Sequence, residues 1–383
     1  MMRGWRLGVL AMWLLAFAAG AAAEGVEGVP DARFERLARG INLPFWFWYA
    51  PDTPEAIDAR FSDDDFALIR DLGFTFVRVP VDLEFVMDAS APDLLRSQGL
   101  AHLDGGLDRL LAHDLAVVID LHSTSLADSD VSNYSGRLED PAFVETFIAF
   151  WRAFAAHLSA RDPERVFLEP MNEPVFYDNP DAWPPIQARV LAAIRAAAPD
   201  HTLIATGARW STLDTLTALE PLSDPNIIYN FHFYEPFYFT HQGAEWSSDD
   251  VKPMRSVPYP SSPAAVEPAI TRQRDPQVQA RLRQYGEERW DAGDIAWRIG
   301  QAAGWAARHR VRLMCNEFGV YSQYAPPVDR ARWIEDVRTA LERHAIAWAM
   351  WEYDDSFGLV RRDGESVRVN EAAARALGLN PPE

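Results

Sequence analysis

The 383-residue sequence contains very little cysteine and very little lysine. Cys315 is its only cysteine, so an intrachain disulfide is impossible and two-cysteine redox motifs are excluded. Lys252 is its only lysine, so arginine supplies nearly all of the positive charge. The 36 basic side chains face 56 acidic ones, which gives a formal net charge of −20. Such an acidic chain is poorly suited to bind a polyanion, and we expect no nucleic-acid partner.

A hydrophobic run long enough to span a membrane is missing after the N-terminus. The N-terminus has Arg3 and Arg6, then an apolar stretch at 7–20 and three alanines at 21–23. This order of a positive region, a short apolar region and small residues is typical of a secretory signal peptide. We therefore expect a signal peptide at 1–23 and a mature protein at 24–383 that works in the periplasm or outside the cell. The alternative is an uncleaved N-terminal anchor.

The rest of the chain alternates short apolar runs with amphipathic stretches, and 48% of all residues are hydrophobic. A chain of this composition can bury a sizeable core. The apolar runs that we expect to be strands buried on both faces cover residues 41–45, 74–80, 115–122, 166–172, 202–206, 226–234, 311–317 and 345–351. Eight strand–helix units predict an α/β protein with a single (β/α)8 barrel domain. The rival is an open doubly wound sheet, which the lack of a Gly-x-Gly-x-x-Gly motif after the first run disfavours.

One connection is much longer than a barrel requires. It covers residues 235–290, between the sixth and seventh runs. We expect a long loop insertion there, with a proline- and serine-rich loop at 253–263 and a short helix at 277–288.

Polar residues and one tryptophan gather at the C-terminal ends of six of the predicted strands. They are Arg78, His122, Asn172, Glu173, His232, Tyr234, Asn316, Glu317, Trp351 and Glu352. A single polar residue at a strand end usually faces solvent. In a barrel, however, these strand ends converge on one pocket, so six of them together predict an active site.

Two of these residues, Glu173 and Glu317, suit the hydrolysis of a glycosidic bond. That reaction needs one carboxylic acid to protonate the leaving oxygen, and one carboxylate to attack the anomeric carbon or activate water. Asn172 is placed to hydrogen-bond a sugar 2-hydroxyl. We expect Arg78 to keep Glu317 ionised and Tyr234 to donate a hydrogen bond to the same carboxylate.

The remaining residues at the strand ends have supporting roles in this hypothesis. We expect His122 and His232 to bind sugar hydroxyls or to tune Glu173, and Trp351 to offer a flat face to a sugar ring. The charge on Glu317 would oppose ionisation of Glu173 and so raise the pKa of Glu173.

The motifs around these residues resemble glycoside hydrolase family 5, the cellulase family. The resemblance is carried in order by Val77-Arg78-Val79-Pro80, Asp120-Leu121-His122, Leu168-Glu169-Pro170-Met171-Asn172-Glu173-Pro174, His232-Phe233-Tyr234, Asn316-Glu317-Phe318-Gly319 and Trp351. The family implies a (β/α)8 barrel and hydrolysis with retention of configuration. It also implies that Glu173 is the acid/base and Glu317 the nucleophile. Pro170 departs from the usual small or aliphatic residue without removing a catalytic group.

Aromatic residues outside the strand ends are candidates for binding a glycan chain. Residues 239–246 resemble a loop of bacterial endoglucanase-like family members, which makes His241 and Trp246 candidate sugar contacts. Trp46 and Trp48 follow the first strand and could form a stacking wall. For Trp246, Trp46 and Trp48 the alternative is packing within their own loops.

The leading hypothesis is a secreted, retaining endo-β-1,4-glucanase that needs no metal or cofactor. Its partner is a polysaccharide or oligosaccharide, with no membrane contact after signal removal, and a monomer is favoured. β-Mannan, xylan, β-1,3-glucan and a bacterial exopolysaccharide are alternative substrates. Two other hypotheses are a metal-dependent barrel hydrolase that uses His122 and His232, and a non-catalytic carbohydrate-binding barrel.

Overall fold

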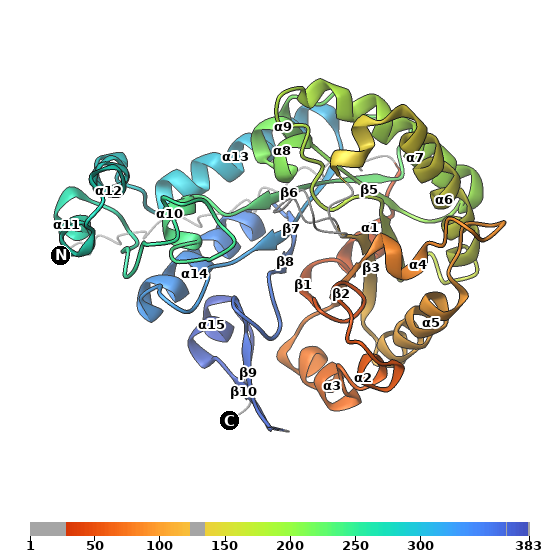
Figure 1. Ribbon diagram of the computed structural model, residues 1–383, viewed down its shortest axis with the longest axis horizontal. Helices are drawn as coiled ribbons and strands as arrows, with labels where there is room; N and C mark the ends of the chain where they lie inside the picture. The colour runs from red at the N-terminus through yellow and green to blue at the C-terminus, as the bar shows by residue number, and fades with distance from the viewer. Residues whose placement is uncertain (1–27, 123–134, 365, 382–383) are drawn as a thin grey trace, which may run out of the picture.

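The computed structural model describes residues 28–122, 135–364 and 366–381, so the predicted signal peptide lies outside the described residues. Eight parallel strands form a closed barrel in sequence order, with β8 paired to β1 (Figure 1). The strands are β1 Arg39–Asn42, β2 Phe76–Val81, β3 Ala116–Leu121, β4 Val166–Glu169, β5 Leu203–Thr206, β6 Ile227–Phe233, β7 Arg312–Phe318 and β8 Ala347–Met350. The predicted (β/α)8 barrel is therefore confirmed.

Helices surround this barrel and connect its strands (Figure 1). The longer ones are α3 Asp63–Leu72, α5 Ser97–Ala112, α6 Pro141–Leu158, α7 Trp183–Ala197, α11 Pro263–Arg272, α12 Pro276–Glu288, α13 Ala292–His309 and α14 Pro327–Arg343. The shorter ones are α1 Asp31–Glu35, α2 Pro54–Asp58, α4 Leu83–Val86, α8 Ala208–Ser211, α9 Leu213–Thr217, α10 Phe237–Thr240, α15 Glu371–Ala376 and the 3₁₀ turns Gly136–Glu139 and Pro180–Ala182. Among the described helices, none is long and apolar enough to cross a membrane.

Two helix starts illustrate how local sequence fixes these elements. The Ser62 hydroxyl accepts from the backbone N–H of Asp65, and the Asp65 carboxylate accepts from the backbone N–H of Ser62. Asp291 and Asp294 form the same reciprocal pair before α13. Each pair satisfies backbone donors that a helix leaves free at its N-terminus, so both helices begin at defined residues.

The barrel interior is apolar toward the N-terminal ends of the strands. One buried cluster joins inward residues of the strands to α1 and its flanks, including Phe34, Leu37, Phe76, Val118, Phe167, Ile228 and Met314. Gly40 leaves room for this layer, because a Cβ at that position would lie only 2.2 Å from the ring of Phe76. The N-terminal end of the barrel is thus packed like a core.

The next layer of the interior is polar. Side chains on a strand alternate between its two faces, so residues two apart share a face. Two positions after Phe76, Val118, Phe167 and Met314 come Arg78, Asp120, Glu169 and Asn316, all fully buried. A polar layer therefore rests on the apolar layer and faces the C-terminal ends of the strands.

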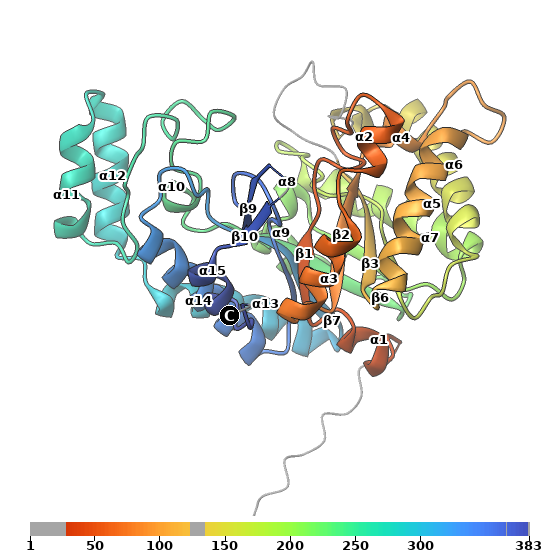
Figure 2. The ribbon, with the colours of Figure 1, turned by 90° about the horizontal axis from the view of Figure 1, so that it is seen from below.

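The insertion after β6 contains more helix than the sequence prediction. The helix predicted at 277–288 is α12, but α11 was not predicted. Ser262 caps α11 by accepting from Ala265 N–H, and Val266 and Ile270 of α11 are buried, as are Val278 and Leu282 of α12. The pair projects from one side of the barrel (Figure 1). Figure 2 shows it on the same end as α2 and α4, opposite α1.

The C-terminal segment also adds elements that the sequence analysis did not predict. A two-stranded antiparallel hairpin, β9 Val360–Asp363 and β10 Ser366–Val369, is followed by α15. Asn370 caps α15 by accepting from Ala373 N–H.

Candidate active site

The carboxylate of Glu317 lies near the end of β7 and is held at both oxygens. Arg78 donates from Nη1 to Oε1 at 2.7 Å, and the Tyr234 hydroxyl donates to Oε2 at 2.9 Å. Nδ1 of His232 lies 3.5 Å from Oε2. The side chain is only 6% exposed. Two donors, one of them cationic, therefore orient this carboxylate.

Arg78 is the centre of the polar layer. It is fully buried on β2, inside the strand and not at its end, because β2 continues to Val81. Its Nε and Nη2 donate to the two oxygens of Glu169 at 2.8 and 3.0 Å, a paired geometry that fixes the plane of the guanidinium. Nη2 also lies 2.9 Å from Asp120. With these contacts made, Nη1 points to Glu317.

Asp120 and Glu169 were missed as functional residues by the sequence analysis, although both stood inside the quoted motifs. Burial raises the pKa of Asp120 to about 7 against the opposing charge of Arg78, and burial also raises the pKa of Glu169. The guanidinium of Arg78 therefore contacts three carboxylates, those of Asp120, Glu169 and Glu317. Asn42 and Asn316 complete the layer: Asn42 Oδ1 accepts from Arg78, and Asn316 Nδ2 donates to Glu169.

Glu173 follows β4 and has a different environment from Glu317. One of its oxygens is hydrogen-bonded to Nδ1 of His232 at 2.8 Å, and its side chain is 20% exposed. Burial raises the pKa of Glu173 to about 8, with the charge of Arg78 opposing the shift. The pKa of Glu173 is therefore raised, as expected, but the expected cause was wrong. Burial, and not the charge of Glu317, raises this pKa. Burial also lowers the pKa of His232, which keeps that ring neutral.

Asn172 and His122 are tied together beside this pair. Asn172 accepts from Arg78 Nη2 at 2.8 Å, and its amide nitrogen lies 3.3 Å from Nε2 of His122. The other ring nitrogen of His122 is 2.7 Å from Asp120. Both nitrogens of His122 are thus engaged within the protein, so this ring orients Asn172. Asn172 and His122 are almost fully buried, at 2% and 4% exposure.

Glu173, His232 and Glu317 meet in one place. Each contributes an atom to a group whose members all lie within 4.8 Å of one another. A carboxylate oxygen of Glu173 is therefore within 4.8 Å of one of Glu317. A carboxyl pair this close, one group hydrogen-bonded to Arg78 and Tyr234 and the other with a raised pKa, is an arrangement that could provide a nucleophile and an acid on the two sides of a single bond.

A comparison with known protein families identifies the family to which the chain belongs. Residues 38–356 match the family described as "Cellulase (glycosyl hydrolase family 5)". This match spans most of the chain. The protein belongs to glycosyl hydrolase family 5. The resemblance in the sequence motifs is thereby confirmed, and the protein is a glycosidase.

Proteins similar to this chain carry endoglucanase names. Endoglucanase C of Acetivibrio thermocellus is 28% identical over 315 residues, which cover 82% of this chain and 90% of that protein. Endoglucanase 3 of Fibrobacter succinogenes is 26% identical over 368 residues, covering 90% of this chain. The chain spans only about half, 53%, of the length of Endoglucanase 3.

Solved structures of Cel5A from Thermotoga maritima have the same fold. One described as a complex with cellobiose is 26% identical, with a TM-score of 0.71, over 91% of this chain and 99% of that one. Another, described as a complex with mannotriose, is 25% identical with a TM-score of 0.70, over 90% and 99%.

Of the two tryptophans predicted to form a stacking wall, only Trp48 adjoins the family 5 site. Its ring lies 4.4 Å from His122 and 6.0 Å, edge-on, from Trp351. Trp351 stacks at 5.3 Å on His122. Trp46, in contrast, is 1% exposed, stacks on Phe47 and donates its N–H to the carbonyl of Ile57. The expectation that Trp46 contacts sugar was wrong, because a fully buried ring has no face for a ligand.

His241 and Trp246 lie on the insertion after β6, and His241 adjoins Tyr234. The ring of His241 is 5.0 Å from that of Tyr234 and stacks at 4.1 Å on Phe237. Burial lowers the pKa of His241 to about 3, so it is neutral. Trp246 is 40% exposed and meets Tyr321 edge-on at 5.0 Å. Because its ring is exposed, Trp246 remains a candidate sugar contact.

The alternative hypothesis of a metal-dependent hydrolase requires a group of metal ligands. In the part of the chain that the structure describes, the one group with suitable ligand spacing is Glu173, His232 and Glu317. His122 is absent from it, so the structure does not assemble the His122–His232 pair of that hypothesis. Glu317 already accepts from Arg78 and Tyr234, and a cation there would compete with the guanidinium.

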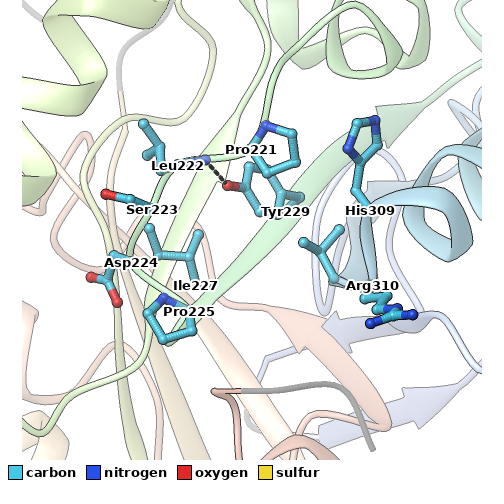
Figure 3. A pocket seen from close by; sticks show the side chains of 10 residues that line it. Pro221, Leu222, Ser223, Asp224, Pro225, Ile227, Tyr229, His309 and Arg310 are labelled. Carbon is cyan, nitrogen blue, oxygen red and sulfur yellow. Dashed lines mark hydrogen bonds between the residues drawn. The ribbon is translucent and has the colours of Figure 1, made fainter. Parts of the chain in front are cut away.

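A cavity of about 490 Å³ lies at the opposite end of the barrel (Figure 3). It is lined by residues near the starts of β6 and β7, among them Ile227, Tyr229 and Val311. Asp224 also lines it, and Asp224 accepts from Arg195. The catalytic centre of a (β/α)8 barrel forms at the C-terminal ends of its strands. This cavity is therefore separate from the family 5 site.

Proposed function

We propose that this protein is a secreted, retaining endo-β-1,4-glucanase, with Glu173 as acid/base and Glu317 as nucleophile. The observation that carries the mechanism is the approach of their carboxylate oxygens to within 4.8 Å. Retaining glycosidases place the two carboxyl groups roughly 5–5.5 Å apart, whereas inverting enzymes need roughly 6.5–9.5 Å to admit a water molecule. The short separation supports direct attack on the sugar by a carboxylate.

The two environments support the division of roles. Glu317 accepts from Arg78 and Tyr234, which favours the anion that attacks the anomeric carbon. Glu173 has a pKa raised by burial to about 8, so it carries a proton for the leaving oxygen near neutral pH. After the glycosyl–enzyme ester forms, the Glu173 carboxylate takes a proton from the water that hydrolyses it. Asn172, held by Arg78, is placed to bind the 2-hydroxyl.

The substrate proposal rests on the relatives. The family is described as cellulase, two relatives are called endoglucanases, and Cel5A of Thermotoga maritima has been solved with cellobiose. β-Mannan is the second candidate, because Cel5A was also solved with mannotriose. Hydrolysis of purified protein against cellulose, β-mannan, xylan, β-1,3-glucan and bacterial exopolysaccharides, with sizing of the products, separates these candidates and distinguishes endo from exo cleavage.

The stereochemistry of azide rescue tests the roles of the two glutamates. Glu317→Ala should lose normal turnover and give a glycosyl azide of inverted configuration, because azide then attacks in a single displacement. Glu173→Ala should still form the covalent intermediate from a substrate with an activated leaving group, and azide should intercept it with retained configuration. The reverse result would exchange the roles, and near-normal turnover of Glu317→Ala would refute the mechanism.

Export is part of this proposal and rests on the sequence pattern of residues 1–23. N-terminal sequencing of the protein recovered from its native host tests it. A mature chain that starts at Glu24 is the expected result, and a chain that retains Met1 would contradict it.

A further inference from the structure

A second cavity, of about 350 Å³, lies in the insertion after β6. It is formed by α10 and its flanks together with the segment that follows α12. Its lining combines three aromatic rings with three carboxylates: Phe237, Tyr238, Trp290, Glu235, Asp250 and Glu288. Its volume falls within the range of roughly 300–1,000 Å³ that is usual for small-ligand sites. Aromatic faces with hydrogen-bond acceptors beside them match the two kinds of surface on a sugar ring.

Several polar groups of this cavity are held in place. Arg298 donates from Nε and Nη2 to both oxygens of Glu235, each at 2.7 Å. The indole N–H of Trp290 donates to Glu288 at 3.0 Å. A carboxylate can accept about four hydrogen bonds, so both glutamates keep acceptor capacity for sugar hydroxyls. The cavity is therefore preorganised, with fixed acceptors and an oriented indole ring.

A short series of packed side chains lies between the lining of the cavity and Glu317. Glu235 directly follows Tyr234, whose hydroxyl is bound to Glu317. The 45%-exposed ring of Phe237 stacks on His241 at 4.1 Å, and His241 meets Tyr234 at 5.0 Å. Figure 2 shows α10, α11 and α12 on the same end of the barrel as α2 and α4, which follow the C-terminal ends of β1 and β2. A glycan chain cleaved at Glu317 would be able to continue toward this cavity.

We propose that this cavity is a distal subsite that binds an uncharged sugar ring of the same glycan chain that is cleaved at Glu173 and Glu317. The inference rests on the proposed glycosidase function and adds a chain-length preference to it. The charge of the lining disfavours acidic sugars. Three carboxylates face one close arginine, Arg298, and Asp250 has only the more distant Arg281 at 3.7 Å. A carboxylated sugar would be repelled there.

The experiment compares kcat/KM along a series of cello-oligosaccharides of increasing length, for the parent enzyme, Phe237→Ala and Trp290→Phe. The parent should gain efficiency when the chain becomes long enough to fill the cavity. Phe237→Ala should lose that gain, by roughly 3- to 10-fold for long chains, and leave the shortest substrate unchanged. Trp290→Phe keeps an aromatic face but loses the N–H bond to Glu288, and should lose less.

Trp297→Ala is the matched control. Trp297 is 62% exposed on α13 and does not line the cavity, so its removal should leave the whole series unchanged. Carboxymethylated oligosaccharides should show little or no gain with length in any variant. The proposal is overturned if Phe237→Ala lowers all lengths equally, or lowers none, or if carboxymethylated chains gain as much as neutral ones.

Failure of the proposed function would look different. If the parent enzyme does not cleave β-1,4-glucan at all, the substrate assignment is wrong, and the same series is then run with oligosaccharides of the glycan that it does cleave. A length effect that depends on Phe237 in that series supports the subsite, and its absence refutes the subsite independently.

Discussion

Replacing Glu173 by glutamine should make the protein more stable at alkaline pH while removing its activity. Glu173 has a pKa of about 8 in the folded protein because burial disfavours its charged form. On unfolding, the side chain returns to water, where a glutamate ionises near pH 4.5. A raised folded-state pKa contributes stability that is fully present below the unfolded pKa and is lost as the pH rises through the folded pKa. Glutamine cannot ionise and does not lose that stability.

The size of the effect follows from the two pKa values. They differ by roughly 3.5, and each pKa unit corresponds to about 1.4 kcal/mol. Between about pH 5 and about pH 9, the parent protein should lose on the order of 4 kcal/mol of its free energy of unfolding through this one carboxyl group. Glu173→Gln should lack this loss, so the stability of the variant relative to the parent should increase steadily over that interval. The same neighbour, His232, remains hydrogen-bonded to the amide.

Urea unfolding of both proteins at several pH values measures this difference. Glu220→Gln is the control, because that glutamate is exposed and its surroundings change little on unfolding. The control should follow the parent protein at every pH. The difference in unfolding free energy between Glu173→Gln and the parent could instead stay constant within about 1 kcal/mol from about pH 5 to about pH 9. In that case burial would not be the dominant influence on the pKa of Glu173, and the assignment of Glu173 as the acid would lose its electrostatic basis.

Three further predictions test other parts of the site. The kcat/KM of the parent enzyme on an unactivated glycan should fall on the alkaline side with an apparent pKa of about 8. This alkaline fall should be weaker for a substrate with an activated leaving group, which needs no protonation. The pH–rate profiles of the two substrates measure both effects. Arg78→Lys should cost about 3–5 kcal/mol of unfolding free energy and most of kcat, because lysine cannot reproduce the paired contacts to Glu169 while reaching Glu317. Thermal unfolding measures the loss of stability, and steady-state kinetics measure the loss of kcat. An unchanged kcat would contradict the role given to Arg78. Trp46→Phe should lower the free energy of unfolding by about 1–3 kcal/mol and leave KM unchanged. Trp48→Ala, in contrast, should mainly raise KM. Equal effects of the two variants on KM would contradict the placement of Trp46 in the core.

The fold was predictable because its signal is repeated along the whole chain. Eight apolar runs with a strand-like pattern occur between amphipathic stretches, and all eight are strands of the barrel. The insertion was harder to predict, because α11 contains Pro268 in its interior, which discourages a helix assignment from sequence. In the structure, packing of Val266 and Ile270 against α12 outweighs that local preference.

The two glutamates that we propose as catalytic were predicted because they stand at strand ends, but the polar layer beneath them was not predicted. Asp120 and Glu169 sit within apolar strands, where polar residues are rarely buried unless they are paired. Their partner, Arg78, is distant in the sequence and comes from another strand. Only the closed barrel, which places positions two residues beyond Phe76, Val118 and Phe167 in one interior layer, brings these groups into contact. The period-two alternation of the strands was the available signal.

The assignment of the two glutamates depends on their surroundings more than on their motifs. Both are carboxyl groups at the ends of barrel strands, and from sequence they were distinguished only by the neighbours expected for Glu317 and by the family resemblance. In the structure, Glu317 receives donors at both oxygens, one of them from Arg78, whose plane is fixed by Glu169. Glu173 has the neutral imidazole of His232 as its close partner and a pKa raised by burial. Environments that favour the anion of one carboxyl group and the protonated form of the other are the arrangement that double displacement requires.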